Sequence, residues 1–230
     1  FDQNFAYLWN SGTNTFDQLA FGGSMAGYAG FNITAKDFYI SGTSYPFADN
    51  TARFVFTGEG ITPNANGSAV FFFDGTDIKD YTDIGDNPDY AQPPQGALIR
   101  ANYVTWFNGR INFIVPDIAG VSYLQGILYS GIRDAGGNGD KFNVPGSGLF
   151  QCDTFQYITG FAIIGQVLGL NFNETAFVLE KTADAFNPYF SRQIPCVEGT
   201  DAKFSGVSWN DIEYSLGKTG ALGLDGRRSL

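Results

Sequence analysis

The stretch ALIRANYVTWFNGRINFIV, residues 97–115, decides the fold. Two runs rich in aromatic and β-branched residues, 97–107 and 110–115, flank the dipeptide Asn108-Gly109. Such runs suit a pleated, half-buried strand, and Asn-Gly is the dipeptide that best fits the two positive-φ positions of a type I′ turn. The stretch therefore predicts an antiparallel β-hairpin.

The composition extends this prediction to the rest of the chain. The 230 residues include 23 Phe, 12 Tyr and 30 Gly but one Met, which favours strands joined by glycine turns. Further strands are expected at 5–9, 38–40, 53–57, 69–73, 121–132 and 212–216, and the uniformly apolar run 150–172 is expected to be a central strand. The fold class predicted is all-β, a mainly antiparallel, jelly-roll-like β-sandwich.

One segment favours a helix instead. Apolar residues at spacings of three and four form a stripe from Phe172 to Phe186, Asn173 can cap the first turn, and Asn187-Pro188 can end the run. We therefore expect one short α-helix near 174–186. The length fits a single domain over 1–230, and the acidic loop and proline-rich breaker at 74–96 are the best candidate for an internal boundary.

Charge and hydropathy restrict the partners. The net charge of −10 disfavours nucleic acid and anionic membranes, and no apolar run approaches the roughly 20 residues of a transmembrane helix. The first residues, FDQNFAYLW, lack an initiator Met, which we interpret as a chain whose leader was removed, with a fragment of a larger precursor as the alternative. A secreted, extracellular protein is the expectation.

Secretion agrees with two further features. Cys152 and Cys196 are the only cysteines and are expected to form a disulfide worth about 4 kcal/mol, two separate buried thiols being the alternative. Sequons for N-glycosylation occur at Asn32, Asn66 and Asn173. Asn66 lies in a turn-like context and is the favoured acceptor, whereas a helix cap at Asn173 would occupy that side chain.

The absence of histidine excludes most hydrolase chemistry. Without it there is no Ser-His-Asp or Cys-His nucleophile, no His-ligated zinc and no imidazole acid-base catalysis. Paired carboxylates can still hydrolyse glycosidic bonds, and Glu213 with Asp211, on a predicted strand beside aromatic residues, is the candidate pair. The alternative reading of Glu213 is a solvent-facing strand residue.

Aspartates that recur every third residue suggest the only candidate cofactor. Asp74, Asp77, Asp80 and Asp83 begin this series, and oxygen ligands on a loop are what Ca²⁺ prefers, although an ordinary solvated acidic loop has the same composition.

Aromatic residues supply the candidate binding surfaces. Trp209 and Tyr214 could stack on sugars, and Phe5, Tyr7 and Trp9 could add as a strand to a second copy of the chain or pair within it. With no catalytic constellation evident, the leading hypothesis is a non-catalytic extracellular protein, either a self-assembling coat, fibre or matrix subunit or a glycan-binding, adhesive module. A carbohydrate-active hydrolase is the alternative, and a viral capsid jelly-roll subunit is a weaker one.

Overall fold

The computed structural model describes residues 5–26, 31, 39–46, 51–59, 61, 69–81, 89–90, 96–132, 141–195, 198–200, 202–203 and 205–227. These residues form strands β1 to β20 and one 3₁₀ turn, η1 (Gly23–Met25), and they include no α-helix. Nearly all of the strand pairs are antiparallel, and β3 with β7 is a parallel pair. The all-β, mainly antiparallel class predicted from the sequence is confirmed. No helix of the described residues has the length and apolarity needed to span a membrane.

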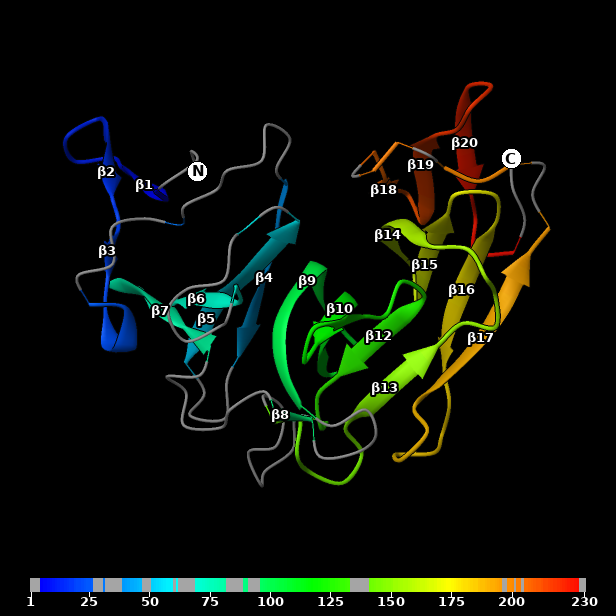
Figure 1. Ribbon diagram of the computed structural model, residues 1–230. Helices are drawn as coiled ribbons and strands as arrows, with labels where there is room; N and C mark the ends of the chain where they lie inside the picture. The colour runs from blue at the N-terminus through cyan, green and yellow to red at the C-terminus, as the bar shows by residue number, and fades with distance from the viewer. Residues whose placement is uncertain are drawn as a thin grey trace. The chain divides into compact units, whose positions relative to one another are not determined.

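The strands form five small sheets (Figure 1). The first two sheets are the pair β1-β2 and the five-stranded sheet β3-β7-β6-β5-β4, built from β1 (Tyr7–Asn10), β2 (Thr15–Gln18), β3 (Ala20–Phe21), β4 (Tyr39–Pro46), β5 (Ala52–Glu59), β6 (Phe71–Phe73) and β7 (Asp77–Asp80).

The third sheet has the order β13-β12-β10-β9-β8, with β11 paired to β10. Its strands are β8 (Asp89–Tyr90), β9 (Gly96–Phe107), β10 (Arg110–Ile118), β11 (Val121–Ser122), β12 (Gly126–Tyr129) and β13 (Gly148–Gln151). The last two sheets are β14-β15-β16-β17 and β18-β19-β20, built from β14 (Ile158–Ile164), β15 (Val167–Phe172), β16 (Ala176–Lys181), β17 (Tyr189–Ile194), β18 (Val207–Trp209), β19 (Ile212–Leu216) and β20 (Ala221–Leu224).

The hairpin predicted at residues 97–115 is confirmed as β9 and β10. Phe107 and Arg110 pair across the turn, and Asn108 and Gly109 take φ angles of 53° and 68°, the positive values that a type I′ turn requires. All residues of β10 are buried. Among the described residues these are the two longest strands, and they lie where the sequence places them.

The helix expected near 174–186 is wrong, because residues 176–181 form β16. This strand pairs with β15 on one side and β17 on the other, and Ala176 to Leu179 are all buried. The apolar residues are contiguous, so they fit a strand covered on both faces as well as they fit a helical stripe. Phe186, the last member of the supposed stripe, is 66% exposed.

The central strand expected across 150–172 is divided. Residues 158–164 and 167–172 form β14 and β15, a hairpin that turns at Gly165, where φ is 57°. The turn is hidden in the sequence because Gly165-Gln166 interrupts the apolar run only briefly. The start of the acidic loop also carries a strand, since residues 77–80 form β7.

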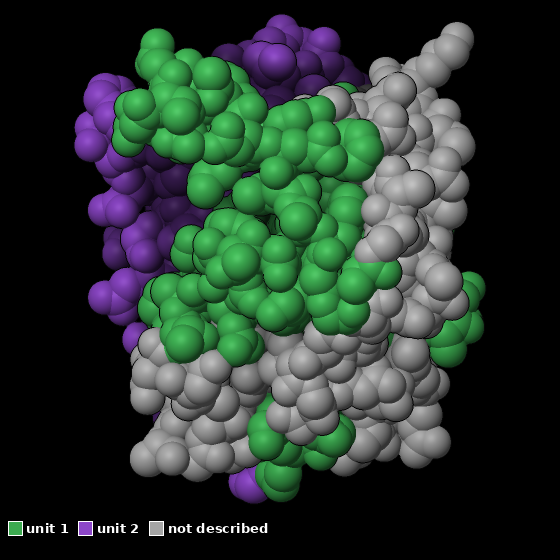
Figure 2. Space-filling view, turned by 90° about the vertical axis from the view of Figure 1, so that its left-hand side faces the viewer, with its two compact units in different colours: residues 1–122, 128–148 green, residues 123–127, 149–230 purple. Residues whose placement is uncertain are grey.

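The chain divides into two compact units. Unit 1 comprises 1–122 and 128–148, and unit 2 comprises 123–127 and 149–230; Figure 2 colours them green and purple. In unit 1 a core of aliphatic and aromatic residues contains Phe31, whose ring packs edge-on against Phe21 and Phe56. The expectation of a single domain over 1–230 stays a prediction.

In unit 2 the β18-β19-β20 sheet contacts the four-stranded sheet. Leu224 of β20 packs with Ile164, Ala176, Val178 and Ile194 of that sheet. Glu213 and Ser215 of β19 are also buried, whereas β18 is exposed throughout and Tyr214 and Leu216 of β19 are open to solvent or a ligand.

Candidate ligand-binding face

A tight hairpin positions the candidate aromatic residues of unit 2. Trp209 and Ile212 pair across the two-residue loop Asn210-Asp211, whose φ angles are 51° and 59°. Positive φ at both positions defines a type I′ turn, and Asn and Asp tolerate that conformation better than other non-glycine residues. The sequence Trp-Asn-Asp-Ile therefore fixes the register of β18 against β19.

The register divides β19 into two faces. Glu213 and Ser215 are buried, whereas Tyr214 and Leu216 are exposed, as expected for side chains that alternate across a strand. Val207 is the cross-strand partner of Tyr214, and it is exposed on the same side. The outward side of this sheet thus carries large apolar groups.

Trp209 is the most exposed tryptophan of the chain, at 67% of its surface. On the other flank of Tyr214 the cross-strand partner is Gly223, which has no side chain to cover the ring. Asn210 and Asp211 are exposed at the adjoining turn. We define Val207, Trp209, Tyr214 and Leu216, with Asn210 and Asp211 at their edge, as the aromatic face.

The chemistry of the aromatic face suits a carbohydrate. Aromatic rings cover the apolar CH surfaces of a sugar ring, and an amide and a carboxylate at the edge can exchange hydrogen bonds with its hydroxyl groups. Both residues singled out in the sequence for stacking, Trp209 and Tyr214, lie on this face.

Glu213 is buried beneath the aromatic face. Its side chain is 0% exposed, and the Nδ2 group of Asn171 donates a short hydrogen bond to its Oε1 atom. Oε2 has no hydrogen-bond partner in the part of the chain that the structure describes. Burial raises the pKa of Glu213 to about 7, and the hydrogen bond from Asn171 offsets part of that rise.

Two glycines make room for this carboxyl group. A Cβ atom added at Gly169 would lie 2.9 Å from Oε2, and one added at Gly206 would lie 2.7 Å from Oε1. Real side chains do not approach so closely, so the carboxyl group occupies space that only glycine leaves free. Glu213 is thus enclosed between β19, β15 and the segment at Gly206.

The candidate catalytic pair lies in two different environments. Glu213 is inaccessible, whereas Asp211 is exposed at the turn, where its carboxylate lies near Gly165. The strand predicted around Glu213 is confirmed, but the reading of Glu213 as a solvent-facing residue is wrong. The alternation expected along this strand is present, but Glu213 lies on the buried side, because Trp209 and Tyr214 occupy the exposed side.

The predicted disulfide remains a prediction. Cys152 is a buried thiol whose pKa burial raises to about 12, against a smaller opposite effect of a hydrogen bond with Ser191. Cys196 lies outside the described residues.

Of the three sequons, only that of Asn173 is described; Asn32 and Asn66 lie outside the described residues. Asn173 does not cap a helix. Its Oδ1 atom accepts a hydrogen bond of 3.2 Å from the backbone N–H of Tyr157, and Thr175 of the same sequon is buried. Both the acceptor amide and the sequon hydroxyl group are therefore engaged in the fold.

The first acidic residues of the candidate calcium loop have partners within the chain. Asp74 accepts hydrogen bonds from the backbone N–H groups of Thr76 and Asp77 and pairs with Lys79. Burial raises its pKa, but these bonds outweigh burial and lower the pKa to about 2. Asp77 and Asp80 belong to β7, and Asp83 lies outside the described residues. No group of three or more Asp, Glu, Cys or His residues able to hold a metal occurs in the described ranges.

The candidate assembly strand pairs within the chain. Residues 7–10 form β1 and pair with β2, and Trp9 packs edge-on against Phe16 with ring centroids 4.9 Å apart. Phe5 is half-buried, whereas Tyr7 and Trp9 remain exposed. The expected strand is present, but it does not bury the aromatic side chains at 7 and 9.

Sequence reasoning missed the partners of Glu213. Asn171 is 42 positions away in the chain, so no local pattern links the two residues. The Asn210-Asp211 turn, by contrast, could have been recognised, because Asn-Asp between two alternating runs is a hairpin signal.

Neither a scan of protein-family models nor a search of curated proteins finds a match for this chain.

Proposed function

We propose that this chain is a non-catalytic, extracellular glycan-binding module that acts in adhesion. The observation that carries the proposal is the exposure of Trp209 and Tyr214 on one side of a three-stranded sheet whose other side is packed. A large apolar surface that stays in contact with water is costly unless a partner covers it.

The surroundings of these rings favour a sugar over a protein partner. The edge of the aromatic face carries the exposed amide of Asn210 and the exposed carboxylate of Asp211. A sugar ring needs this combination of an apolar platform and a few polar groups. The net charge of −10 also favours a neutral ligand over an anionic one.

The hydrolase alternative receives less support. Hydrolysis needs two carboxyl groups that both reach the glycosidic bond, about 5 to 10 Å apart. Glu213, the residue that burial would suit as an acid, is 0% exposed and cannot touch a substrate bound on the outer side. Asp211 can accept a hydrogen bond from a sugar hydroxyl group, but one accessible carboxylate does not form the acid-base pair that hydrolysis needs.

Self-assembly is the second candidate function. The exposed rings of Trp9 and Phe16 on the β1-β2 pair support it, because a two-stranded sheet leaves edges that another strand can join. Deleting residues 1–10 should leave a folded chain that has lost self-association. Unfolding of the truncated chain, or unchanged association, would rule this assembly strand out.

The fold that accompanies the proposal is a β-sandwich. Packing of the β18-β19-β20 sheet on the β14-β15-β16-β17 sheet supports this architecture for unit 2, and a jelly-roll arrangement for the chain as a whole remains part of the proposal.

The test is glycan-array binding of the native chain and two variants. Trp209→Ala should lose binding, whereas Trp106→Ala should keep it, because Trp106 is also exposed, at 43%, but lies in unit 1. Both variants are checked by circular dichroism. Absence of glycan binding by the native chain, or equal binding by all three proteins, would refute the proposal.

A further inference from the structure

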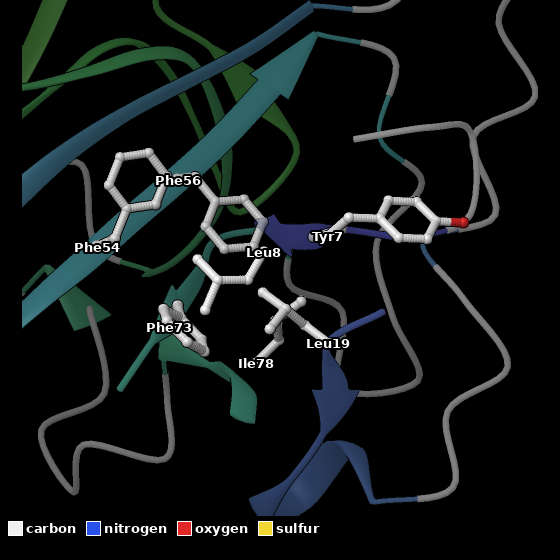
Figure 3. A pocket seen from close by; sticks show the side chains of 8 residues that line it. Tyr7, Leu8, Leu19, Phe54, Phe56, Phe73 and Ile78 are labelled. Carbon is white, nitrogen blue, oxygen red and sulfur yellow. The ribbon is translucent and has the colours of Figure 1, made fainter. Parts of the chain in front are cut away.

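Unit 1 contains a cavity of about 270 Å³ beside the N-terminal strand (Figure 3). One wall is a row of three directly paired residues on the five-stranded sheet: Phe54 of β5 opposes Phe73 of β6, which opposes Ile78 of β7. Phe56, two positions along β5, stacks beside Phe54. The register of three strands therefore gathers these side chains on one face.

Residues of the N-terminal segment form the opposite wall. Ala6 and Leu8 line the cavity, and Figure 3 shows Leu8 directed toward Phe56 and Phe73, while the Tyr7 ring extends away from them. Leu19 closes the side next to Ile78. The lining is mostly apolar, and none of the residues that line the cavity is charged.

The residues that line the cavity differ in burial, so the cavity has a buried floor and an exposed rim. Ala6, Phe56 and Ile78 are almost completely buried, whereas Leu8 is 51% exposed and Phe54 is also exposed. The cavity thus opens to solvent through apolar side chains. Water inside it would find few hydrogen-bond partners, so an apolar ligand gains by filling it and by covering the rim.

We propose that this cavity binds a small, neutral, aromatic ligand. The absence of any charged side chain from its lining excludes an ionic ligand, because a charge there would lose its hydration without gaining a partner. An apolar cavity of about 150 Å³ stays dry and accepts benzene, so 270 Å³ accommodates a ligand of two or three rings. The three phenylalanines of the wall offer faces and edges for ring packing.

The ligand site is independent of the aromatic face. All of its lining residues belong to unit 1, whereas Trp209 and Tyr214 belong to unit 2. Glycan binding and occupancy of the cavity can therefore be measured separately, and failure of one leaves the other intact.

The experiment titrates the full chain with N-phenyl-1-naphthylamine, a neutral aromatic probe whose emission rises in apolar surroundings, with naphthalene as competitor. We expect one saturable site per chain and displacement by naphthalene. Leu8→Trp, at a half-exposed position that tolerates a larger side chain, should fill the opening and weaken binding at least tenfold. Ala6→Phe, which places a larger side chain at the buried floor of the cavity, should weaken binding to the same extent.

The matched control is Val121→Ala. Val121 is exposed in unit 1, at 54%, but does not line the cavity, so the variant should bind the probe as the native chain does. If Ala6→Phe fails to fold, Leu8→Trp alone decides. Absence of saturable binding, equal affinity of Leu8→Trp and the native chain, or loss of binding in Val121→Ala would each overturn the proposal. Sedimentation velocity measures whether the chain self-associates under the same conditions. A probe signal that appears only when the chain self-associates would also overturn the proposal, because a second copy would then occupy the cavity.

Discussion

Replacing Glu213 by Gln should change how the stability of the chain depends on pH. In the folded chain burial raises the pKa of Glu213 from 4.5 to about 7. An acid with a higher pKa in the folded state binds its proton more tightly there, so ionisation opposes folding. The glutamine side chain has nearly the same shape, cannot ionise, and can still accept the hydrogen bond from Asn171.

The magnitude follows from the difference in pKa. Below pH 4.5 both states hold the proton, and Glu213 imposes no penalty. Between pH 4.5 and 7 the unfolding free energy falls by about 1.4 kcal/mol per pH unit, and above pH 7 the loss is complete at about 3 kcal/mol. Relative to the native chain, Glu213→Gln should therefore gain about 3 kcal/mol between pH 4.5 and pH 8.

The assay is urea unfolding of both proteins at the two pH values. The change between the pH values isolates ionisation, because the cost of placing an amide N–H₂ group beside Gly169 is the same at both. The control is Glu174→Gln, which removes the same charge from an exposed position and serves as the baseline for the comparison. A Glu213→Gln difference that is equal at pH 4.5 and pH 8 would refute the reasoning.

Three further predictions follow from the fold and from the candidate sites. Leu179→Ala should lower the unfolding free energy by roughly 2 to 5 kcal/mol, because the Leu179 side chain is fully buried in β16. Phe186→Ala, at an exposed position, should change it by less than about 0.5 kcal/mol. Similar losses for both variants would favour a shared helical stripe instead. Cys152 should resist alkylation in the native chain, because its side chain is buried. Denatured, non-reduced protein should contain no free thiol, because Cys152 and Cys196 are expected to be bonded, and two thiols per chain would exclude the disulfide. Any bound metal should be Ca²⁺, held at Asp74, Asp77, Asp80 and Asp83. Added calcium should then raise the melting temperature, and a chelator should lower it. Identical melting curves, with no metal found by elemental analysis, would show that the segment is a solvated acidic loop.

Local signals in the sequence were sufficient where a turn and its flanking strands are adjacent. Asn108-Gly109 between two β-rich runs determines the β9-β10 hairpin, and the alternation at 212–216 determines β19. Both depend on neighbours within a few residues.

Local signals failed where the apolar pattern is continuous. Ala176 to Leu179 are all apolar, so periodicity cannot distinguish a buried strand from a buried helix, and the pairing of β16 with β15 and β17 decides the outcome. The turn at Gly165 was concealed because the apolar run continues on both sides of Gly165-Gln166.

The candidate sites divide in the same way. Trp209 and Tyr214 could be named from composition, because aromatic residues beside carboxylates on a predicted strand suggest stacking on a sugar. The burial of Glu213 could not, because it depends on Asn171, Gly169 and Gly206, which only the tertiary fold brings to its carboxyl group. The cavity beside Ala6 and Leu8 likewise arises from the register of β5, β6 and β7.

The most direct test of the proposed glycan site is the indole region of the nitrogen–proton NMR spectrum. The chain has three tryptophans, so this region contains three signals, which Trp9→Phe, Trp106→Phe and Trp209→Phe assign. On titration with a glycan that the array selects, the proposal predicts that the Trp209 signal moves and the signals of Trp9 and Trp106 stay in place. Movement of Trp9 or Trp106 with a stationary Trp209 signal would contradict it.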